Sequence, residues 1–157
     1  MATTLTDREI WTVLEEVVDP EIPVLTIADM GILRDVEITG SDSVVVTITP
    51  TYSGCPAMDL IRTEVLAALE QAGIPNGEVR MVFSPAWTTD WMTDEAKTKL
   101  AAFGIAPPGA VATPTAVLCP RCASSNIRTV SQFGSTACKA LMVCDHCGEP
   151  FDHFKEI

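Results

Sequence analysis

Two CxxC pairs in the last quarter of the chain constrain its fold more than any other feature of the sequence. CPRC supplies Cys119 and Cys122, and CDHC supplies Cys144 and Cys147 after 21 intervening residues. Each pair lets two thiolates from one tight turn face the same point, and two such turns complete a tetrahedron around a metal ion. The spacing predicts a zinc ribbon. Because four protein ligands leave no open coordination position, this zinc should be structural.

Other interpretations of these thiols stay open at this stage. Four cysteines also hold iron–sulfur clusters, and four unrelated buried cysteines would need no metal. His146 and His153 could each replace a ligand, although we expect an exposed turn for His146 and a strand beside Phe151 and Phe154 for His153. Cys138 should lie on a ribbon strand, either packed or near the metal. About forty residues cannot stabilise themselves by burial alone, so a metal would supply what this small core lacks.

The N-terminal part of the chain begins with the patterns of one helix and one hairpin. In TDREIWTVLEEVVDPEIP, Thr6 and Glu9 have the spacing of a capping box, and the apolar residues follow a helical stripe until Asp19-Pro20. Apolar and polar residues then alternate on both sides of Gly40-Ser41-Asp42, which predicts a β-hairpin.

A second helix, a third strand and a third helix follow. The second helix should begin at Pro56 and end at Gly73, GEVRMVFSP should form the strand, and Thr93 should cap the last helix. The order predicts an α+β fold: a small two-layer domain of helix, hairpin, helix, strand and helix, followed by the ribbon. We expect the first domain at residues 1–105, a Pro-rich linker or packed extended connection at 106–115, and the zinc ribbon at 116–157.

A lone cysteine precedes the second helix. Cys55, directly before Pro56, is expected at the N-cap, where the positive end of the helix favours thiolate over thiol. A thiolate there would be a nucleophile or a metal ligand. The alternative is that Cys55 is a small residue that fills a turn. Asp19 and Glu21 flank Pro20. The three residues form either a turn that closes the first helix or a site with a functional pair of carboxylates.

Charge is unevenly distributed along the chain. Ten Lys and Arg against 21 Asp and Glu give a net charge of −11, all of it in residues 1–103, because residues 104–157 hold 4 basic and 4 acidic side chains. Such a surface repels phosphate backbones, so we expect no nucleic-acid partner. The sequence shows no signal peptide and no run of about 18 apolar residues, so we expect a cytoplasmic protein without membrane contact, whose cysteines serve as metal ligands or reactive thiols.

Several segments together resemble a known family. DPEIPVLTIADMGILRDVEI, VVVTITPTYSGCPAMDLI and VRMVFSPAWTTDWMTDEAKTKL are similar to the small domain of the iron–sulfur cluster assembly factors, with their DPE turn and their lone Cys before a helix. The match covers about residues 5–105. With the ribbon segment FGSTACKALMVCDHCGEPFDHFK added, nearly the whole chain resembles the D subunits of bacterial phenylacetyl-CoA epoxidases, which are ring-1,2-epoxidising monooxygenases.

The resemblance implies an accessory role without catalysis. It implies that the protein supplies or matures a metal centre for the oxygenase or for its iron–sulfur reductase. We expect docking through the ribbon, because the ribbon is near neutral before metal binding and rich in apolar residues: Phe133, Leu141, Phe151 and Phe154. Cys55 would be a transient ligand of iron or of an iron–sulfur cluster, with Asp19 and Glu21 as polar neighbours. A single cysteine cannot hold a cluster within one chain, so the cluster would bridge two copies in a homodimer or be shared with a client.

Three other functions compete with this one. A general iron–sulfur carrier would have no dedicated client, which leaves the ribbon unexplained. A nucleic-acid-binding zinc ribbon is disfavoured by the charge of −11. An enzyme with Cys55 as nucleophile would need a base, and the two histidines of the sequence, His146 and His153, both lie in the ribbon.

Overall fold

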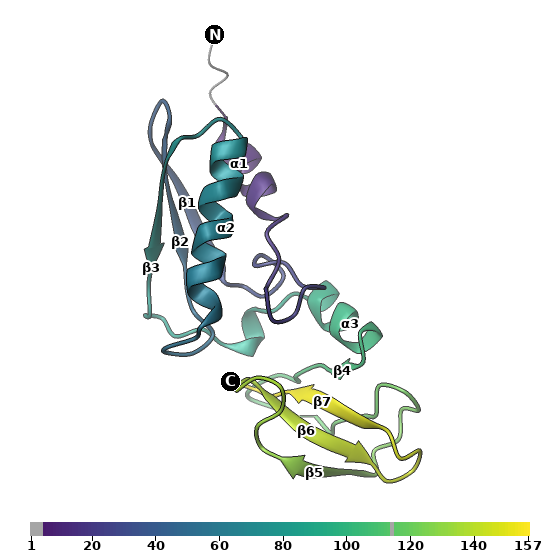
Figure 1. Cartoon of the computed structure of the whole chain (residues 1–157). Helices are drawn as coiled ribbons and strands as arrows, with labels where there is room; N and C mark the ends of the chain where they lie inside the picture. The colour runs from purple at the N-terminus through teal and green to yellow at the C-terminus, as the bar shows by residue number, and fades with distance from the viewer. Residues whose placement is uncertain (1–4, 114) are drawn as a thin grey trace. The chain divides into compact units, whose positions relative to one another are not determined.

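The protein consists of two compact units in the computed structural model, which describes residues 5–113 and 115–157. One unit extends to Trp87, and the other runs from Thr88 to Ile157. Each unit has its own sheet, of three strands in the first and four in the second. The chain is therefore a mixed α+β protein with a separate C-terminal sheet, as the sequence predicted (Figure 1).

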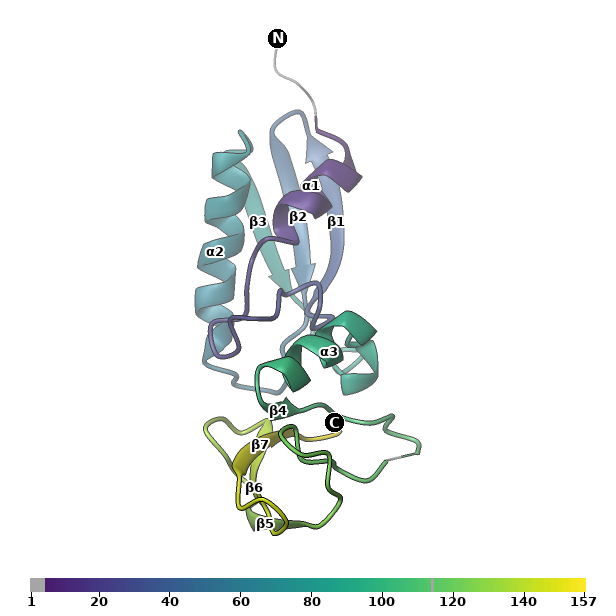
Figure 2. The same ribbon diagram turned by 90° about the vertical axis from the view of Figure 1, so that its right-hand side faces the viewer.

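The first unit is a three-stranded sheet covered by two helices. Its elements are α1 (Asp7–Leu14), β1 (Leu33–Gly40), β2 (Ser43–Ile48), α2 (Ala57–Gln71) and β3 (Asn76–Met81). Strand β2 is central, antiparallel to β1 and parallel to β3, so α2 is the crossover between two parallel strands. Both helices lie on the same face of the sheet (Figures 1 and 2). This layer buries the apolar side chains that the sequence spaced at helical and strand periods.

Helix α1 ends earlier than its apolar stripe predicted. The Thr6 capping box forms as expected, but the C-cap is Glu15 rather than a residue near Asp19. Beyond it, Val17 is buried and Val18 makes an isolated antiparallel bridge to Thr26. The apolar stripe continued past the helix because the extended segment packs Val17 onto the same core, which periodicity alone cannot distinguish from another helical turn.

Helix α2 approaches β3 closely at Gly77. A Cβ atom at this position would lie 2.7 Å from Leu69 Cδ1, and Leu69 is fully buried. A residue without a side chain therefore lets α2 pack down on the sheet. Strand β3 ends at Met81, so the expected third strand is present but shorter than GEVRMVFSP.

The second unit contains a helix and a four-stranded sheet. Its elements are the short 3₁₀ helix η1 (Thr89–Trp91), α3 (Asp94–Ala102), β4 (Ile105–Ala106), β5 (Ile127–Ser131), β6 (Lys139–Cys144) and β7 (Pro150–Phe154). The strand order is β4-β7-β6-β5, with β4 parallel to β7 and the other pairs antiparallel. Thr93 caps α3 through its side chain, as predicted.

Strand β4 is an element that the sequence analysis missed. It occupies the start of the Pro-rich stretch, where Ile105 pairs with Asp152 and Ala106 with His153. Two residues are too short for a period-2 pattern, so only the pairing with β7 defines this strand. The boundaries at residues 105 and 115 stay predictions, and residue 114 lies outside the described residues.

Candidate functional site

The four CxxC cysteines sit in two turns of the same form. In the first turn, the Cys119 N–H donates to the Ser124 carbonyl and the Ala123 N–H donates to the Cys119 carbonyl. In the second turn, the Cys144 N–H donates to the Glu149 carbonyl and the Gly148 N–H donates to the Cys144 carbonyl. Ala123 and Gly148 close these turns with positive φ, at 61° and 77°. Equivalent turns thus present each pair of thiols in the same way.

The distances between the thiols suit one metal ion. Cys119 Sγ lies 3.7 Å from Cys147 Sγ, Cys122 Sγ lies 3.6 Å from Cys144 Sγ, and all four sulfur atoms lie within 4.8 Å of one another. A tetrahedron with Zn–S bonds of about 2.3 Å has sulfur–sulfur edges of about 3.8 Å. A cluster of several irons would hold the thiolates further apart, so the donor set fits a single tetrahedral ion.

The polypeptide backbone prepares one of these thiols to bind as a thiolate. N–H groups of Cys147 and then of His146 stabilise the charged sulfur of Cys144 and lower its pKa to about 6. An N–H of Ser124 likewise favours the Cys122 thiolate. However, desolvation and the hydrogen bonds with the other thiols outweigh it and raise the Cys122 pKa to about 12. Four thiolates at this spacing therefore need a cation among them.

Two surface ion pairs link the metal-binding turns to their surroundings. Arg121 Nη1 lies 2.8 Å from Glu149 Oε2, which ties the first turn to the end of the second. Arg128 Nε on β5 lies 2.9 Å from Asp145 Oδ1. These pairs could not be predicted from the sequence, because nothing in the local pattern brings together residues so far apart in the chain. Such exposed pairs are screened by solvent and contribute little to stability.

The remaining ribbon residues that the sequence singled out are not part of the thiol cluster. His146 is exposed in its turn and His153 is buried on β7, as expected. Cys138 is buried just before β6 rather than on a strand, with its Sγ 3.0 Å from Thr136 Oγ1. The described cluster of metal-ligating side chains consists of the four CxxC cysteines alone.

The FGSTACKAL segment of the ribbon forms a polar network that the sequence analysis also missed. Lys139 is 5% exposed, and its Nζ lies 3.7 Å from Asp152 Oδ2, which also accepts a hydrogen bond of 2.9 Å from Ser135 Oγ. The Gly134 N–H donates to the Lys139 carbonyl at 2.6 Å. A buried lysine needs such a paired carboxylate, so this network fixes the loop between β5 and β6.

Cys55 lies at the start of α2, one residue before the position predicted. The N-cap is Pro56, and the Cys55 carbonyl accepts a hydrogen bond from Met58 N–H in the first turn. The thiol is half-buried, and Thr51 Oγ1 donates to it across 3.9 Å. Pro56 has φ −69° and ψ −19°, a helical conformation that the fixed φ of proline favours at the start of a helix. Cys55 is therefore partly accessible at the positive end of a 15-residue helix.

Asp19 holds the turn that follows α1. Its side chain is 5% exposed, and Oδ1 accepts the N–H groups of Glu21 and Ile22, both at 2.8 Å. Pro20, inside this turn, and Leu60, in the first turns of α2, line one depression, so the turn lies beside the helix that Cys55 precedes. Glu21 is half-buried. Roles for Asp19 and Glu21 toward iron stay predictions.

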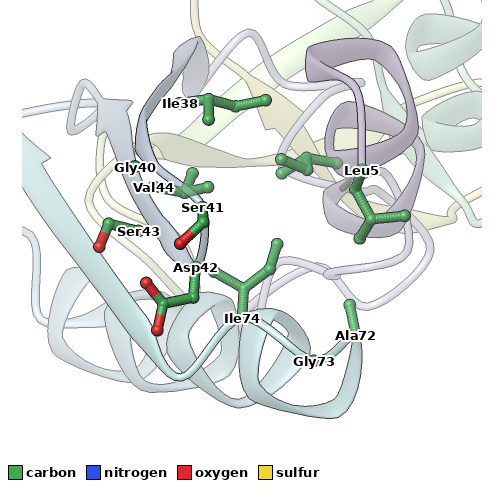
Figure 3. Close-up of a pocket in the computed structure, with 11 residues that line it drawn as sticks. Leu5, Ile38, Gly40, Ser41, Asp42, Ser43, Val44, Ala72, Gly73 and Ile74 are labelled. Atoms are coloured by element: carbon green, nitrogen blue, oxygen red, sulfur yellow. The ribbon is translucent and has the colours of Figure 1, made fainter. Parts of the chain in front are cut away.

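A different pocket lies at the opposite end of α2 from Cys55. Figure 3 shows it between the β1–β2 turn, Leu5 and the residues that follow α2. Its volume is about 70 Å³, well below the range of roughly 300–1,000 Å³ that holds most small ligands. Asp42, at its rim, accepts a hydrogen bond of 3.0 Å from Asn76 Nδ2. This pocket is too small to be the functional site.

The described helices are all unsuited to crossing a bilayer, since none combines sufficient length with sufficient apolar character.

Comparison with known proteins identifies both parts of the chain. Residues 7–82 match the family model of an iron–sulfur cluster assembly protein, and residues 106–155 match that of the PaaD zinc β-ribbon domain. The fold is similar to a solved domain of unknown function, DUF59, from Bacillus anthracis. That match has a TM-score of 0.56 and 30% identity, and it covers 60% of this chain and 90% of the other. The first unit thus defines an iron–sulfur cluster assembly type of domain, here joined to a zinc ribbon.

Full-length similarity then defines the particular family. The chain is 48% identical over 152 residues to a protein of Escherichia coli (strain K12) that is provisionally named as the D subunit of 1,2-phenylacetyl-CoA epoxidase, covering 94% of this chain and 92% of that one. An Fe–S protein maturation auxiliary factor of Porphyromonas gingivalis is 35% identical, over 60% of this chain and 90% of its own length. The chain belongs to the family of these D subunits, as the resemblance indicated.

Proposed function

We propose that the protein is an accessory, non-catalytic component of a phenylacetyl-CoA monooxygenase system. In this proposal it assembles or delivers an iron or iron–sulfur centre to the oxygenase or the reductase. The observation that carries the proposal is Cys55, a half-buried thiol at the positive end of α2, within the part of the chain that matches iron–sulfur cluster assembly proteins. The names of the relatives support an accessory role in maturation.

The roles of the two cysteine sites differ in this proposal. The ribbon holds a structural zinc, because four thiolates occupy all of its coordination positions. The ligands are Cys119, Cys122, Cys144 and Cys147. Cys55 binds iron or a cluster only transiently, because one thiolate needs further ligands from a client or from a second copy of the chain. The hydroxyl of Thr51 lies 3.9 Å from this sulfur and donates to it, which holds the side chain in place at the start of α2.

The test compares two single-cysteine variants in cells that express the oxygenase and its reductase. Cys55→Ala should leave the fold and the zinc intact, while the client proteins accumulate with less iron and acid-labile sulfide. Cys138→Ser, the matched control, removes a buried thiol outside both sites and should leave client loading unchanged. Iron and sulfide are measured on the clients after anaerobic purification.

One outcome separates an assembly factor from a working component of the enzyme. Oxygenase whose metal centres have been filled beforehand should turn over without this protein. A stoichiometric requirement for it in that reconstituted reaction would overturn the assembly role.

A general iron–sulfur carrier is the second candidate function. It is favoured by the match of the first unit to maturation factors that span only 60% of this chain. A general carrier should load unrelated apo-proteins as well as the epoxidase components, and it should do so without residues 106–157. Loss of client loading when the ribbon is removed favours the dedicated role.

A further inference from the structure

A groove runs along the surface between α1 and α2. Two depressions of about 410 Å³ each follow the two helices, and they share Val13, Glu16, Ala68 and Gln71 in their walls. Because the walls are shared, the depressions form one continuous groove, which we call the α1–α2 groove. The helices that form it lie side by side on one face of the sheet (Figure 2).

The wall of the groove is apolar and partly exposed. Val18 is 44% exposed and Leu60 is 48% exposed, whereas the neighbouring Val17 is buried. These side chains border the depression that Ala67 and Ala68 also line. A continuous depression that retains exposed branched side chains is typical of a contact surface, since scattered apolar residues alone would not form a groove.

The rim of the groove is acidic. Glu16 on one side and Glu64 on the other line it and are exposed, and no Lys or Arg is among the described residues that line it. Residues 1–87 as a whole hold 4 Lys and Arg against 14 Asp and Glu, a net charge of −10. Neither helix carries a basic residue in its last turn to offset the negative end of its dipole. The groove therefore attracts cations and repels acidic surfaces.

The groove starts beside the turn and helix end that the proposed function uses. Pro20, inside the Asp19–Glu21 turn, and Leu60, five residues after Cys55, line one end, and Ala72 lines the other. From Leu60 to Ala72 the helix rises by about 18 Å, which is the length of roughly three helical turns. A helix of that length laid in the groove would begin near Leu60, five residues after Cys55.

We propose that the α1–α2 groove docks a basic amphipathic helix of the client protein, so that the client's own ligands meet the metal at Cys55. This inference rests on the proposed function, because it names the contact through which the client reaches that cysteine. Apolar residues at helical spacing fill the groove, and Lys or Arg on both flanks face Glu16 and Glu64. A second copy of the chain is disfavoured as occupant, since it would bring two acidic units together.

The direct test uses a synthetic peptide and purified full-length protein without iron. The peptide is a fluorescein-labelled helix of about three to four turns, with Leu at i, i+3, i+4 and i+7 and Lys elsewhere. We expect saturable binding by fluorescence anisotropy, and shifts of backbone amide signals along α1 and α2. A peptide of the same composition with a scrambled order has the same charge but no apolar face, and should bind at least about tenfold more weakly.

Matched variants separate the groove from general charge attraction. Glu16→Lys combined with Glu64→Lys should weaken peptide binding by about tenfold or more, because both flanking pairs become repulsive. Glu37→Lys combined with Glu78→Lys makes the same change in net charge at exposed positions of β1 and β3, and should alter binding much less. Leu60→Asp should also weaken binding, and circular dichroism checks that each variant is folded.

Several outcomes would overturn the docking proposal. They are equal binding of the patterned and scrambled peptides, equal effects of the two double variants, or amide shifts confined to the open face of the sheet. Sedimentation that shows self-association lost in the Glu16/Glu64 variant would instead assign the groove to a second copy.

The result is independent of iron transfer, because Cys55→Ala should bind the peptide as well as the unchanged protein does. Intact peptide binding with no effect of Cys55→Ala on client loading would reject the proposed function and keep the groove. Normal client loading by Cys55 without peptide binding would reject the groove alone.

Discussion

His153 is a buried polar side chain at the edge of the ribbon core. It is 4% exposed, and within the described residues neither ring nitrogen has a hydrogen-bond partner. Its Nε2 lies 3.7 Å from Glu156 Oε1, which accepts the N–H of Gly109 at 2.9 Å. Burial lowers the pKa of His153, and the Glu156 carboxylate opposes this shift only in part. The native state therefore favours the neutral imidazole.

This environment predicts a loss of stability in acid. The folded pKa lies below the unfolded value of about 6.5, so the unfolded chain binds the proton first and stability falls as the pH drops below that value. His153→Leu fills the same space without a titrating group. The unfolding free energy of His153→Leu minus that of the unchanged protein should increase as the pH is lowered from about 7.5 to about 5.5.

Denaturant unfolding of the zinc-bound forms at each pH measures this difference. Both proteins share the same thiols, so acid effects on the metal site cancel in the comparison. Parallel pH profiles for the two proteins would contradict the role assigned to His153.

Asp19 shows how a single residue can carry a local structure that its sequence context leaves open. The sequence admitted either a turn or a functional carboxylate. In the structure the carboxylate holds a turn, since Oδ1 accepts two backbone N–H groups at 2.8 Å, and a role toward iron stays a prediction. An Asp side chain can accept hydrogen bonds from the N–H groups of the residues two and three positions later and so form a turn by itself. The sequence could therefore suggest this turn. Burial of Asp19 could not be foreseen, because it depends on the surrounding fold.

At the scale of elements, the packing of α2 on β3 depends on a glycine. Gly77→Ala would place a Cβ atom 2.7 Å from Cδ1 of Leu69, whose side chain is fully buried. We expect the unfolding free energy of the first unit to fall by about 1–3 kcal/mol, because the Leu69 side chain must shift inside the packed core. Urea unfolding followed by circular dichroism measures the change.

Gly40→Ala is the matched control for this prediction. Its Cβ would meet Ser43 at 3.4 Å, an ordinary van der Waals distance, at the end of β1. It should cost much less than Gly77→Ala. Equal losses in the two variants would show that the close approach at Gly77 has no special energetic weight.

The two turns of the ribbon show why elements of the metal site were easier to predict than its neighbours. CxxC spacing by itself brings two thiols together in one tight turn. The ion pair between Arg121 and Glu149 and the contact of buried Lys139 with Asp152 join residues that are distant in the chain. The register of β6 against β7 decides the second contact, and the meeting of the two thiol turns decides the first.

At the scale of the whole molecule, the two units should respond differently to loss of metal. The first unit has its own sheet and buried core, whereas the ribbon core around the metal site has few buried side chains. Metal binding by four thiolates supplies apparent folding energy on the order of 10 kcal/mol in such small domains. Removal of the metal by a chelator should therefore unfold the ribbon and leave residues 5–87 folded.

Heteronuclear NMR spectra before and after chelation test this expectation. Signals of the ribbon should collapse while those of the first unit remain dispersed. Cys122→Ser should reproduce the collapse and lower the bound metal, whereas Cys138→Ser should keep both the metal and the spectrum. Loss of the first unit's signals on chelation would show that the two units do not fold separately.

The sequence by itself determined the features that depend on short-range patterns. These are the capping box of α1, the β-hairpin, the cap of α3 and the two thiol turns, because each depends on residues within a few positions of one another. The tertiary structure alone decided where α1 ends, that Ile105 and Ala106 form a strand, and that α1 and α2 leave a groove lined by Glu16 and Glu64. Those features arise from contacts between segments that are distant in the chain. The local sequence is compatible with more than one structure there, and packing in the core stabilises one of them.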